Sequence, residues 1–428
     1  MPEIVIVVEV DVQGRTLGEV EADLMSKVRA ALAPPLQAAL EAVAAEVEPG
    51  TCPGCGRQRR RRGMERRTVV GLFGILELRR QRVECRNCES TGYPADEVLG
   101  LEPGERYSLG VAEMALFSAT DISYAKSAGT MKYLLDVGIS HGQIHRLAQK
   151  EGALIQAEWE RLRRQVFELG DRQILAQLEA GAAVKDLVIV QADGTFVNDR
   201  AADKMEAKAG IVYSRKVQIS KGRTWISDKR TYSGVEAMKV FGEKLALVAA
   251  QQGAFKAKQL WFVSDGDANL RRLRETNFPT AIYFLDLWHL QDRLGSALGD
   301  EGRGQLGGLL TLAVNGDVDG MIEILADAWA AAGQDDQRRQ LLGEVITYID
   351  NNRDGIHNYA KHGGQGSGAI EKTIDIAIGR RLKNKGMSWY RAGADHILAL
   401  RTLKQNRTWS PYWAARRSRT SLLEALAA

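Results

Sequence analysis

Three acidic residues, Asp193, Asp265 and Glu371, have the types and positions that a metal-dependent nuclease site requires. Each aspartate ends a short apolar run, over residues 187–192 and 260–264, and such runs are typical of buried strands. Glu371 opens a long helical segment, where the positive end of the helix dipole favours an ionised carboxylate. Carboxylate oxygens bind hard divalent cations, and two cations roughly 4 Å apart support in-line displacement at phosphorus. The three acids therefore predict a two-metal site for Mg²⁺ or Mn²⁺.

Each acid taken alone also has a simpler interpretation. An Asp-Gly pair after an apolar strand is a common turn signal, and both Asp193-Gly194 and Asp265-Gly266 fit it. Glu371 would equally complement the dipole of its own helix. The occurrence of all three acids in one chain is what favours a site.

The cysteines are confined to two CxxC pairs, formed by Cys52, Cys55, Cys85 and Cys88. A two-residue gap lets both thiolates of a pair reach one tetrahedral Zn²⁺, so the two pairs predict a closed, structural zinc site. Two strand-like runs between the pairs, 68–73 and 75–78, predict a hairpin joined at Gly74. A pair of redox-active dithiols is the alternative, but no thioredoxin-like βαβ pattern surrounds either CxxC. This cysteine usage suits a reducing cytoplasm.

Positive charge is concentrated in two segments, although the whole chain has a formal net charge of only +4. Residues 57–82 contain ten arginines against two glutamates, and residues 372–407 contain nine Lys or Arg against two aspartates. Such clusters suit a polyanionic partner, and we expect double-stranded DNA. Two solvated basic faces without a partner are the alternative. In the second segment, Arg380, Arg381 and Lys383 are the candidates for contacts with DNA phosphates.

The region 101–180 reads as helical and contains a segment that resembles a helix-turn-helix. Its turn has Gly138 at the break and Ser140 as the N-cap of the following helix. That helix would present Gln143 and Arg146 to a DNA groove while its apolar residues pack inward. Residues 151–180 read as a long charged spacer helix.

The order of elements after residue 181 predicts an α/β fold with a mixed sheet. A strand ending at Asp193 is followed by two more strands, a helix, a strand ending at Asp265, a helix and a strand over 281–285. Three early strands followed by alternating helix and strand is the order of the ribonuclease-H-like fold. The first and fourth strands are neighbours in that arrangement, which would bring Asp193 and Asp265 together.

Several motifs resemble those of DDE insertion-sequence transposases of the ISKra and ISLre groups. They are Asp193-Gly194-Thr195, Ser264-Asp265-Gly266-Asp267-Ala268-Asn269, Gly366-Ser367-Gly368-Ala369-Ile370-Glu371 and the closing Arg381-Leu382-Lys383-Asn384-Lys385-Gly386-Met387-Ser388-Trp389. The likeness runs from about residue 50 to 405 and includes the second cysteine pair. Asp286-Leu287-Trp288-His289 also looks like the D-x-x-H element of Mutator-like transposases.

The resemblance implies both a reaction and the residues that perform it. In that family two aspartates and a late glutamate bind the catalytic metals, which carries onto Asp193, Asp265 and Glu371, with Asp286 and His289 as auxiliary residues. The implied reaction cleaves DNA at the element's ends and joins the freed 3′-OH to target DNA. Residues 290–364 would be the helical insertion that such enzymes place before the glutamate helix. Transposases generally act as dimers or larger assemblies, so we expect a homodimer or larger assembly on DNA.

The chain is therefore expected to contain five parts. They are an N-terminal strand and helix in 1–50, a zinc ribbon in 51–100, a helical region in 101–180, a ribonuclease-H-like catalytic domain in 181–405 and a basic tail in 406–428. The first part reads as a strand over 3–12 and a helix over 17–47 that is interrupted at Pro34-Pro35.

No run reaches the ~18 apolar residues of a membrane span, and no secretory signal is visible, so we expect a cytoplasmic protein at the bacterial nucleoid. Two other functions fit the same fold. One is a non-catalytic DNA-binding regulator, and the other is a ribonuclease-H-like nuclease without strand transfer.

Overall fold

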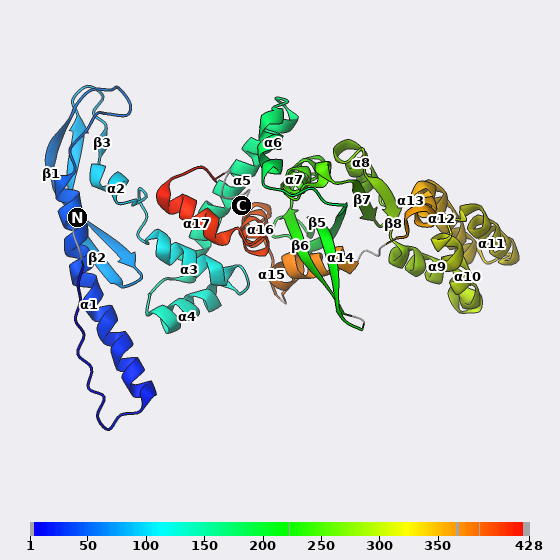
Figure 1. Cartoon of the computed structure of the whole chain (residues 1–428), viewed down its shortest axis with the longest axis horizontal. Coiled ribbons are helices and arrows are strands. Elements are labelled where there is room, and N and C mark those ends of the chain that lie inside the picture. The colour runs from blue at the N-terminus through cyan, green and yellow to red at the C-terminus, as the bar shows by residue number, and fades with distance from the viewer. Residues whose placement is uncertain (1–3, 222, 365–367, 385, 423–428) are drawn as a thin grey trace. The chain divides into compact units, whose positions relative to one another are not determined.

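The structure is a computed structural model, and it describes residues 4–221, 223–364, 368–384 and 386–422 (Figure 1). The chain divides into two compact units. The first comprises residues 1–147 with 416–419, and the second comprises residues 148–415 with 420–428. No helix within the described ranges is both long and apolar enough to cross a membrane.

The first unit combines a long helix, a three-stranded sheet and three short helices. Its elements are α1 (Leu17–Glu46), β1 (Arg59–Gly71), β2 (Gly74–Cys85), β3 (Thr91–Gly92), α2 (Pro94–Val98), α3 (Leu109–Ala119) and α4 (Tyr124–Leu135). The strands are antiparallel in the order β1-β2-β3. The predicted hairpin between the cysteine pairs is present, with strands longer than expected.

Helix α1 begins with a capping box, in which Thr16 and Glu19 satisfy each other's backbone N–H groups. The helix continues through Pro34 and Pro35, so the predicted interruption is wrong. Packing explains its continuity: apolar residues of α1 cover the cluster formed by Val69, Leu76 and Leu78. The prediction of a strand over 3–12 is also wrong for residues 4–12, which are irregular and pair with no strand in the described part of the chain.

Helix α5 (His141–Phe167) continues the chain from the first unit into the second, and α6 (Arg172–Ala180) follows it. The predicted spacer over 151–180 is therefore two helices rather than one. The turn before α5 is as predicted at Ser140, whose hydroxyl accepts a hydrogen bond from the Gln143 N–H at 3.2 Å. The left-handed residue that ends α4 is Asp136, with φ 52°, rather than the predicted Gly138.

The second unit contains a five-stranded mixed sheet. Its strands are β4 (Leu187–Asn198), β5 (Lys204–Ser220), β6 (Arg223–Gly234), β7 (Gln259–Ser264) and β8 (Ile282–Leu285). They lie in the order β6-β5-β4-β7-β8. The pairs β4–β7 and β7–β8 are parallel, and the pairs β4–β5 and β5–β6 are antiparallel. The prediction that the first and fourth strands of this region are neighbours is confirmed.

Helices pack around this sheet and form a helical segment after β8. Those that pack near the sheet are α7 (Met238–Gln251), α8 (Ala268–Asn277), α14 (Gly368–Ile374) and α16 (Arg391–Gln405). The segment after β8 contains α9 (Leu287–Gly302), α10 (Leu306–Val314), α11 (Val318–Ala331), α12 (Asp336–Asn351) and α13 (Arg353–His362). This segment has its own apolar core, to which Leu294, Leu309, Met321 and Leu342 contribute.

The chain returns to the sheet through α14, which contacts β4 and β5. The predicted long helix from Glu371 is divided here, because a π-helical turn, Asp375–Gly379, separates α14 from α15 (Arg380–Leu382). The expected tail over 406–428 includes the helix α17 (Trp409–Ser418), and Trp413 of α17 is fully buried. Residues 423–428 of that tail lie outside the described ranges.

Candidate metal and catalytic site

Three aspartates lie at one level in the parallel part of the sheet, with Asp193 within β4, Asp265 directly after β7 and Asp286 directly after β8. The last printed pairs of the ladder are Gln191 with Val263 on β4 and β7, and Ser264 with Leu285 on β7 and β8. Continuing this register brings Asp193, Asp265 and Asp286 side by side, and the Asp286 N–H donates to the Ser264 carbonyl at 2.8 Å. Neighbouring strands are about 4.8 Å apart, so the three side chains share one edge of the sheet.

Asp193 lies within a strand and does not end one, contrary to the prediction. β4 continues to Asn198, and Asp193 pairs with Ala209 of β5. The turn interpretation of Asp193-Gly194 is therefore wrong. A Cβ at Gly194 would lie 2.5 Å from the Glu206 carboxylate, so the end of that side chain would have to move to admit one.

Asp265 directly follows β7, as predicted, and its backbone is tightly held. Gly266 has φ +84°, and a Cβ there would lie 2.8 Å from Tyr348 and from Asn352. The Tyr348 hydroxyl donates to the Asp265 carbonyl oxygen at 2.6 Å. Since Tyr348 belongs to α12, the helical segment after β8 helps to position Asp265.

Glu371 lies in the first turn of α14, as predicted. The Gln191 side chain of β4 accepts a hydrogen bond from the Ile370 N–H at 3.0 Å, which fixes the start of α14 against the sheet. Gln191 is fully buried. Part of the glycine-rich segment, residues 365–367, lies outside the described ranges.

Asp286 and His289 form a tight pair at the start of α9. Asp286 is fully buried, and its Oδ2 accepts hydrogen bonds from the His289 backbone N–H at 3.2 Å and from the His289 ring Nδ1 at 2.6 Å. With the proton on Nδ1, the ring nitrogen Nε2 is an acceptor. The two predicted auxiliary residues therefore contact each other directly, and their role in catalysis stays a prediction.

Glu371 joins this pair. The ligand atoms of Asp286, His289 and Glu371 all lie within 4.8 Å of one another. Among the described residues, neither Asp193 nor Asp265 completes a group that meets this distance. The structure therefore brings Glu371 together with the two auxiliary residues, whereas the two predicted metal-binding aspartates belong to no such group among the described residues.

The charges of these groups nevertheless affect the pKa values of Asp193 and His289. Burial raises the pKa of Asp193 to about 6, and the negative charges of Asp265 and Glu371 act in the same direction. The hydrogen bond with Asp286 raises the pKa of His289, and the charges of Asp265 and Asp193 add to this effect. Repulsion among carboxylates at one sheet edge is what a bound cation would relieve. Carboxylate oxygens fit Mg²⁺ or Mn²⁺ chemically, whereas an imidazole nitrogen is a ligand that transition metals such as zinc prefer.

The three predicted phosphate contacts have different environments. Lys383 lies beside β4, because its Nζ contacts the hydroxyl of Thr195, two residues after Asp193. Arg380 is exposed and pairs with Asp375 at 3.1 Å. Arg381 is only 1% exposed and lies over the ring of buried Trp389 at 4.8 Å, so its predicted phosphate contact is wrong. Trp389 itself is buried, and its Nε1 donates to the Leu382 carbonyl at 3.3 Å.

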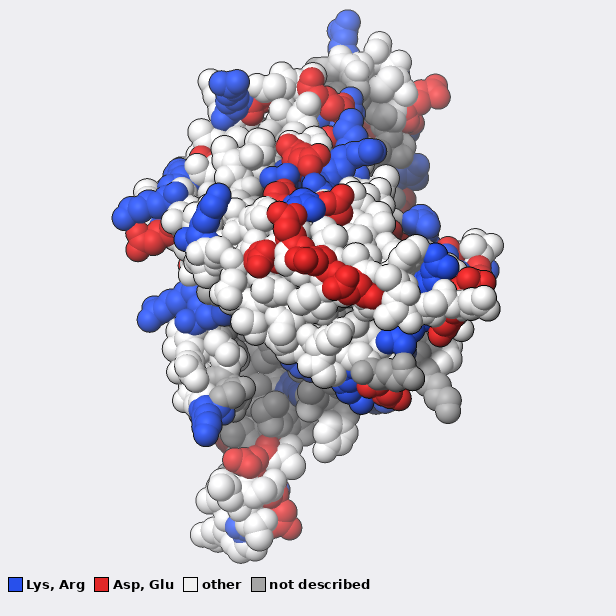
Figure 2. All heavy atoms as spheres, turned by 90° about the vertical axis from the view of Figure 1, so that its right-hand side faces the viewer, with Lys and Arg blue, Asp and Glu red and all other residues white. Residues whose placement is uncertain are grey.

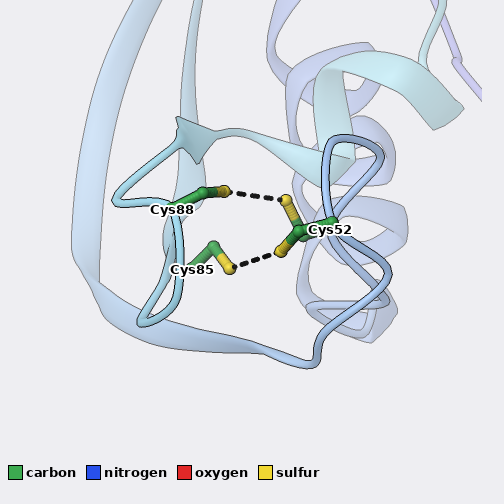
Figure 3. A group of neighbouring side chains, drawn as sticks. Cys52, Cys85 and Cys88 are labelled. Atoms are coloured by element: carbon green, nitrogen blue, oxygen red, sulfur yellow. Dashed lines mark hydrogen bonds between the residues drawn. The ribbon is translucent and has the colours of Figure 1, made fainter.

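The four cysteines converge as predicted (Figure 3). Their sulfur atoms lie within 4.8 Å of one another, with Cys52 Sγ 3.5 Å from Cys88 Sγ and Cys55 Sγ 3.4 Å from Cys85 Sγ. The Ser90 hydroxyl and backbone N–H groups lower the pKa of Cys52 to about 6. Backbone N–H groups also lower the pKa of Cys85. This arrangement can bind a metal ion such as zinc.

Most arginines of the basic hairpin are paired with acids. Arg60 and Arg62 contact Glu84, and Arg67 and Arg80 contact Asp96. Arg61, Arg66 and Arg82 pair with Glu48, Glu77 and Glu65. Seven of the ten arginines at 57–82 therefore have an acidic partner, but these pairs involve only five acids, so the segment keeps an excess of positive charge.

The helix-turn-helix candidates lie on the surface side of α5. Ile144 and Leu147 are buried, as predicted, whereas Arg146 is exposed and its guanidinium lies 3.6 Å from Glu105. Gln143 is partly buried. Arg146 therefore presents its charge at the surface more fully than Gln143 presents its amide, and the contact of both residues with DNA stays a prediction.

The sequence analysis missed two positioning residues, Gln191 and Tyr348. Gln191 is the one amide in an otherwise apolar strand run, and a polar residue in a buried strand needs a partner. The sequence alone therefore indicates that the Gln191 amide has a partner. Tyr348 carried none, because its role depends on how α12 packs against the Asp265 loop.

Comparisons with known proteins agree on one family. The model of the "Uncharacterised protein family (UPF0236)" matches residues 12–410. A relative in Streptococcus gallolyticus, the "UPF0236 protein in vanSb 3'region", is 22% identical over 366 residues, which cover 82% of this chain and 75% of that protein. Because the family model spans nearly all of the sequence, the chain belongs to the UPF0236 family.

Proposed function

We propose that this protein is a DDE-type DNA transposase with a ribonuclease-H-like catalytic domain, which cleaves the ends of a DNA element and joins the 3′-OH to target DNA. One observation carries the proposal: Asp193, Asp265 and Asp286 lie at one level in the parallel part of the sheet, beside Glu371 and His289. The strand order, with two parallel pairs following an antiparallel hairpin, supports the same fold.

Asp193, Asp265 and Glu371 are the residues that would hold Mg²⁺ or Mn²⁺. Two such ions supply an activated water and stabilise the leaving 3′ oxygen when bound. The proposal also fits the raised pKa of Asp193, because crowded carboxylates favour a cation over mutual repulsion.

Other residues of the chain would orient the DNA and the acids. Asp286 holds the His289 ring so that Nε2 remains an acceptor, which lets it receive a proton or a hydrogen bond at the cleavage edge. Lys383 contacts Thr195, which lies on the same strand as Asp193. Its positive charge would bind a phosphate next to the scissile bond. Gln191 and Tyr348 hold α14 and the Asp265 loop in place.

The proposal assigns a structural Zn²⁺ to the four cysteines and duplex DNA as the partner of the whole chain. A homodimer or larger assembly on DNA follows from the need to join two element ends. Location at the bacterial nucleoid follows from the DNA substrate.

A plasmid assay distinguishes the proposed function from its two rivals. The donor is a supercoiled plasmid that carries the DNA flanking the coding region, and the reaction contains Mg²⁺ or Mn²⁺. Joined products support a transposase, nicks alone support a nuclease, and shifted bands without cleavage support a DNA-binding regulator.

Two variants and a control give this assay its specificity. Asp193→Asn and Glu371→Gln should abolish joining while DNA binding persists. Asp375→Asn is the matched control, because Asp375 is an exposed acid four positions from Glu371 that pairs with Lys372 and Arg380. Joining that survives in Asp193→Asn would contradict the proposal.

A further inference from the structure

The β5–β6 hairpin extends beyond the rest of the sheet (Figure 1). The ladder between β4 and β5 ends at the pair of Ile189 with Tyr213, whereas the ladder between β5 and β6 continues to Ser220 with Arg223. Residues 214–229 therefore form a two-stranded ribbon, which we call the arm. At ~3.3 Å per residue, its strands extend roughly 20 Å past the sheet.

The arm is strongly basic, and four of its cations form no ion pair among the described residues. Residues 214–229 contain five Lys or Arg and one acid, Asp228. Asp228 is occupied at the base of the arm by Lys185 at 2.8 Å and by Gln252 at 2.6 Å. Within the described part of the chain, no ion pair forms at Arg215, Lys216, Lys221 or Lys229, in contrast to the paired arginines of the β1–β2 hairpin.

The arm also exposes large apolar side chains. Trp225 is 49% exposed and Ile219 is 55% exposed. Val217 lies directly opposite Trp225 in the ladder, so their side chains share one face. Lysines alone could protect a free sheet edge from aggregation. An exposed tryptophan and isoleucine would instead promote aggregation, so their presence favours a binding role for the arm.

A different surface of the same unit has the opposite charge. α11 exposes Asp319, Glu323 and Asp327 at intervals of one helical turn. Figure 2 faces this end of the molecule and shows acidic side chains gathered in a band. That surface would repel a polyanion, so the positive charge of the arm is a local feature of the unit.

We propose that the arm is a DNA-binding β-ribbon that enters a groove of duplex DNA, with its cations on the phosphates and Trp225 against the bases or sugars. This inference rests on the proposed function for the choice of DNA as the partner. A major groove about 12 Å wide admits a two-stranded ribbon, and apolar side chains can wedge between base steps.

The position of the arm separates its role from catalysis. β5 runs antiparallel to β4, so the arm leaves the sheet where β4 begins, at the end opposite to Asp193 and Asp265. The arm would therefore hold DNA at a distance from the cleavage edge. Changes in the arm should weaken DNA binding without altering the metal site.

The test measures binding of the full-length, zinc-loaded protein to a short fluorescein-labelled duplex in buffer without Mg²⁺ or Mn²⁺, at several salt concentrations. The arm variant is Lys216→Gln/Lys221→Gln/Lys229→Gln. The matched control removes three exposed cations elsewhere, in Lys239→Gln/Arg303→Gln/Lys361→Gln. A second variant, Trp225→Ala, tests the apolar contact. Circular dichroism verifies that each protein is folded.

We expect the arm variant to lose roughly tenfold or more in affinity and to reduce the slope of log K against log salt by about 2 to 3, because each phosphate contact contributes about 0.9. Trp225→Ala should lose affinity with an unchanged slope. An arm variant with the affinity and slope of the control would overturn the inference. The binding test requires no Mg²⁺ or Mn²⁺, so its result is independent of the plasmid assay. Weakened binding by the arm variant, with no joining by the wild type in the plasmid assay, would support the arm and reject the transposase. Joining by the wild type, with unaffected binding by the arm variant, would reject the arm alone.

Discussion

The carboxylate of Asp286 accepts both the backbone N–H and the ring Nδ1 of His289, at 3.2 and 2.6 Å. One buried acid thus caps α9 and fixes the orientation and tautomer of an imidazole that lies beside Glu371. The D-x-x-H spacing allows both hydrogen bonds, because the backbone N–H of the third helical residue points toward the side chain of the N-cap residue.

The first prediction concerns this pair. Asp286→Asn should lower the pKa of His289, because the hydrogen bond and charge of Asp286 are what raise it. NMR titration of the histidine ring signals measures the change. His396, whose ring Nδ1 faces Gln149, serves as the internal control and should titrate as in the wild type. An unaltered titration of His289 would show that Asp286 does not govern it.

The second prediction concerns the stability of the metal-free protein. Burial and carboxylate repulsion raise the pKa of Asp193 to about 6, so its folded form favours the proton. The contribution of Asp193 to stability is therefore fully present below its unfolded pKa of about 3.9 and is lost as pH rises through 6. Asp193→Asn should stabilise the metal-free protein at pH 8 relative to wild type, by on the order of 1–2 kcal/mol.

Urea unfolding of the zinc-loaded protein without added Mg²⁺ or Mn²⁺, at pH 5 and pH 8, checks this sign. The difference between variant and wild type should be larger at pH 8. Added Mn²⁺ should then raise the melting temperature of the wild type and leave that of Asp193→Asn unchanged. A variant that is less stable than wild type at pH 8 would contradict the electrostatic account of the site.

The third prediction concerns the loop after β7. Gly266→Ala introduces a Cβ at φ +84° and within 2.8 Å of Tyr348 and Asn352. We expect a loss of about 1–3 kcal/mol in unfolding free energy and weaker Mn²⁺ binding, because Asp265 is displaced. Gly343→Ala in α12 is the control, since the nearest atom to its new Cβ is 4.0 Å away. Equal effects of the two substitutions would show that the Asp265 loop is not constrained.

The fourth prediction concerns the four cysteines. The purified protein should contain one zinc ion per chain by elemental analysis, and Cys85→Ser should lose it, because Cys85 is fully buried at the centre of the group. Loss of zinc should melt the first unit selectively, since structural zinc contributes folding energy directly. Asp193→Asn should retain its zinc. A full complement of zinc in Cys85→Ser would exclude this site.

The sequence predicted the parts of the fold that depend on local patterns. The spacing of the cysteines, the burial of Ile144 and Leu147 and the central position of β4 and β7 all follow from periodicity or element order. What it could not predict depends on partners distant in sequence. The extension of β4 past Asp193 requires its pairing with β5, and the burial of Arg381 requires the ring of Trp389. Net charge per segment likewise could not show which arginines are paired.

The last prediction concerns a second buried carboxyl, Asp395 of α16. Burial and the charge of Glu236 raise the pKa of Asp395 to about 7, and the Val235 N–H donates to its Oδ1 at 3.1 Å. The stabilising contribution of the protonated form is lost as pH rises through 7. Asp395→Asn keeps the acceptor oxygen without the charge, so its stability relative to wild type should increase between pH 5 and pH 8. Urea unfolding at both pH values tests this, with Asp375→Asn as an exposed control whose difference should not change. A pH-independent difference for Asp395→Asn would mean that Asp395 is ionised in the folded protein, and that Lys244, 3.6 Å from Glu236, compensates for both acids.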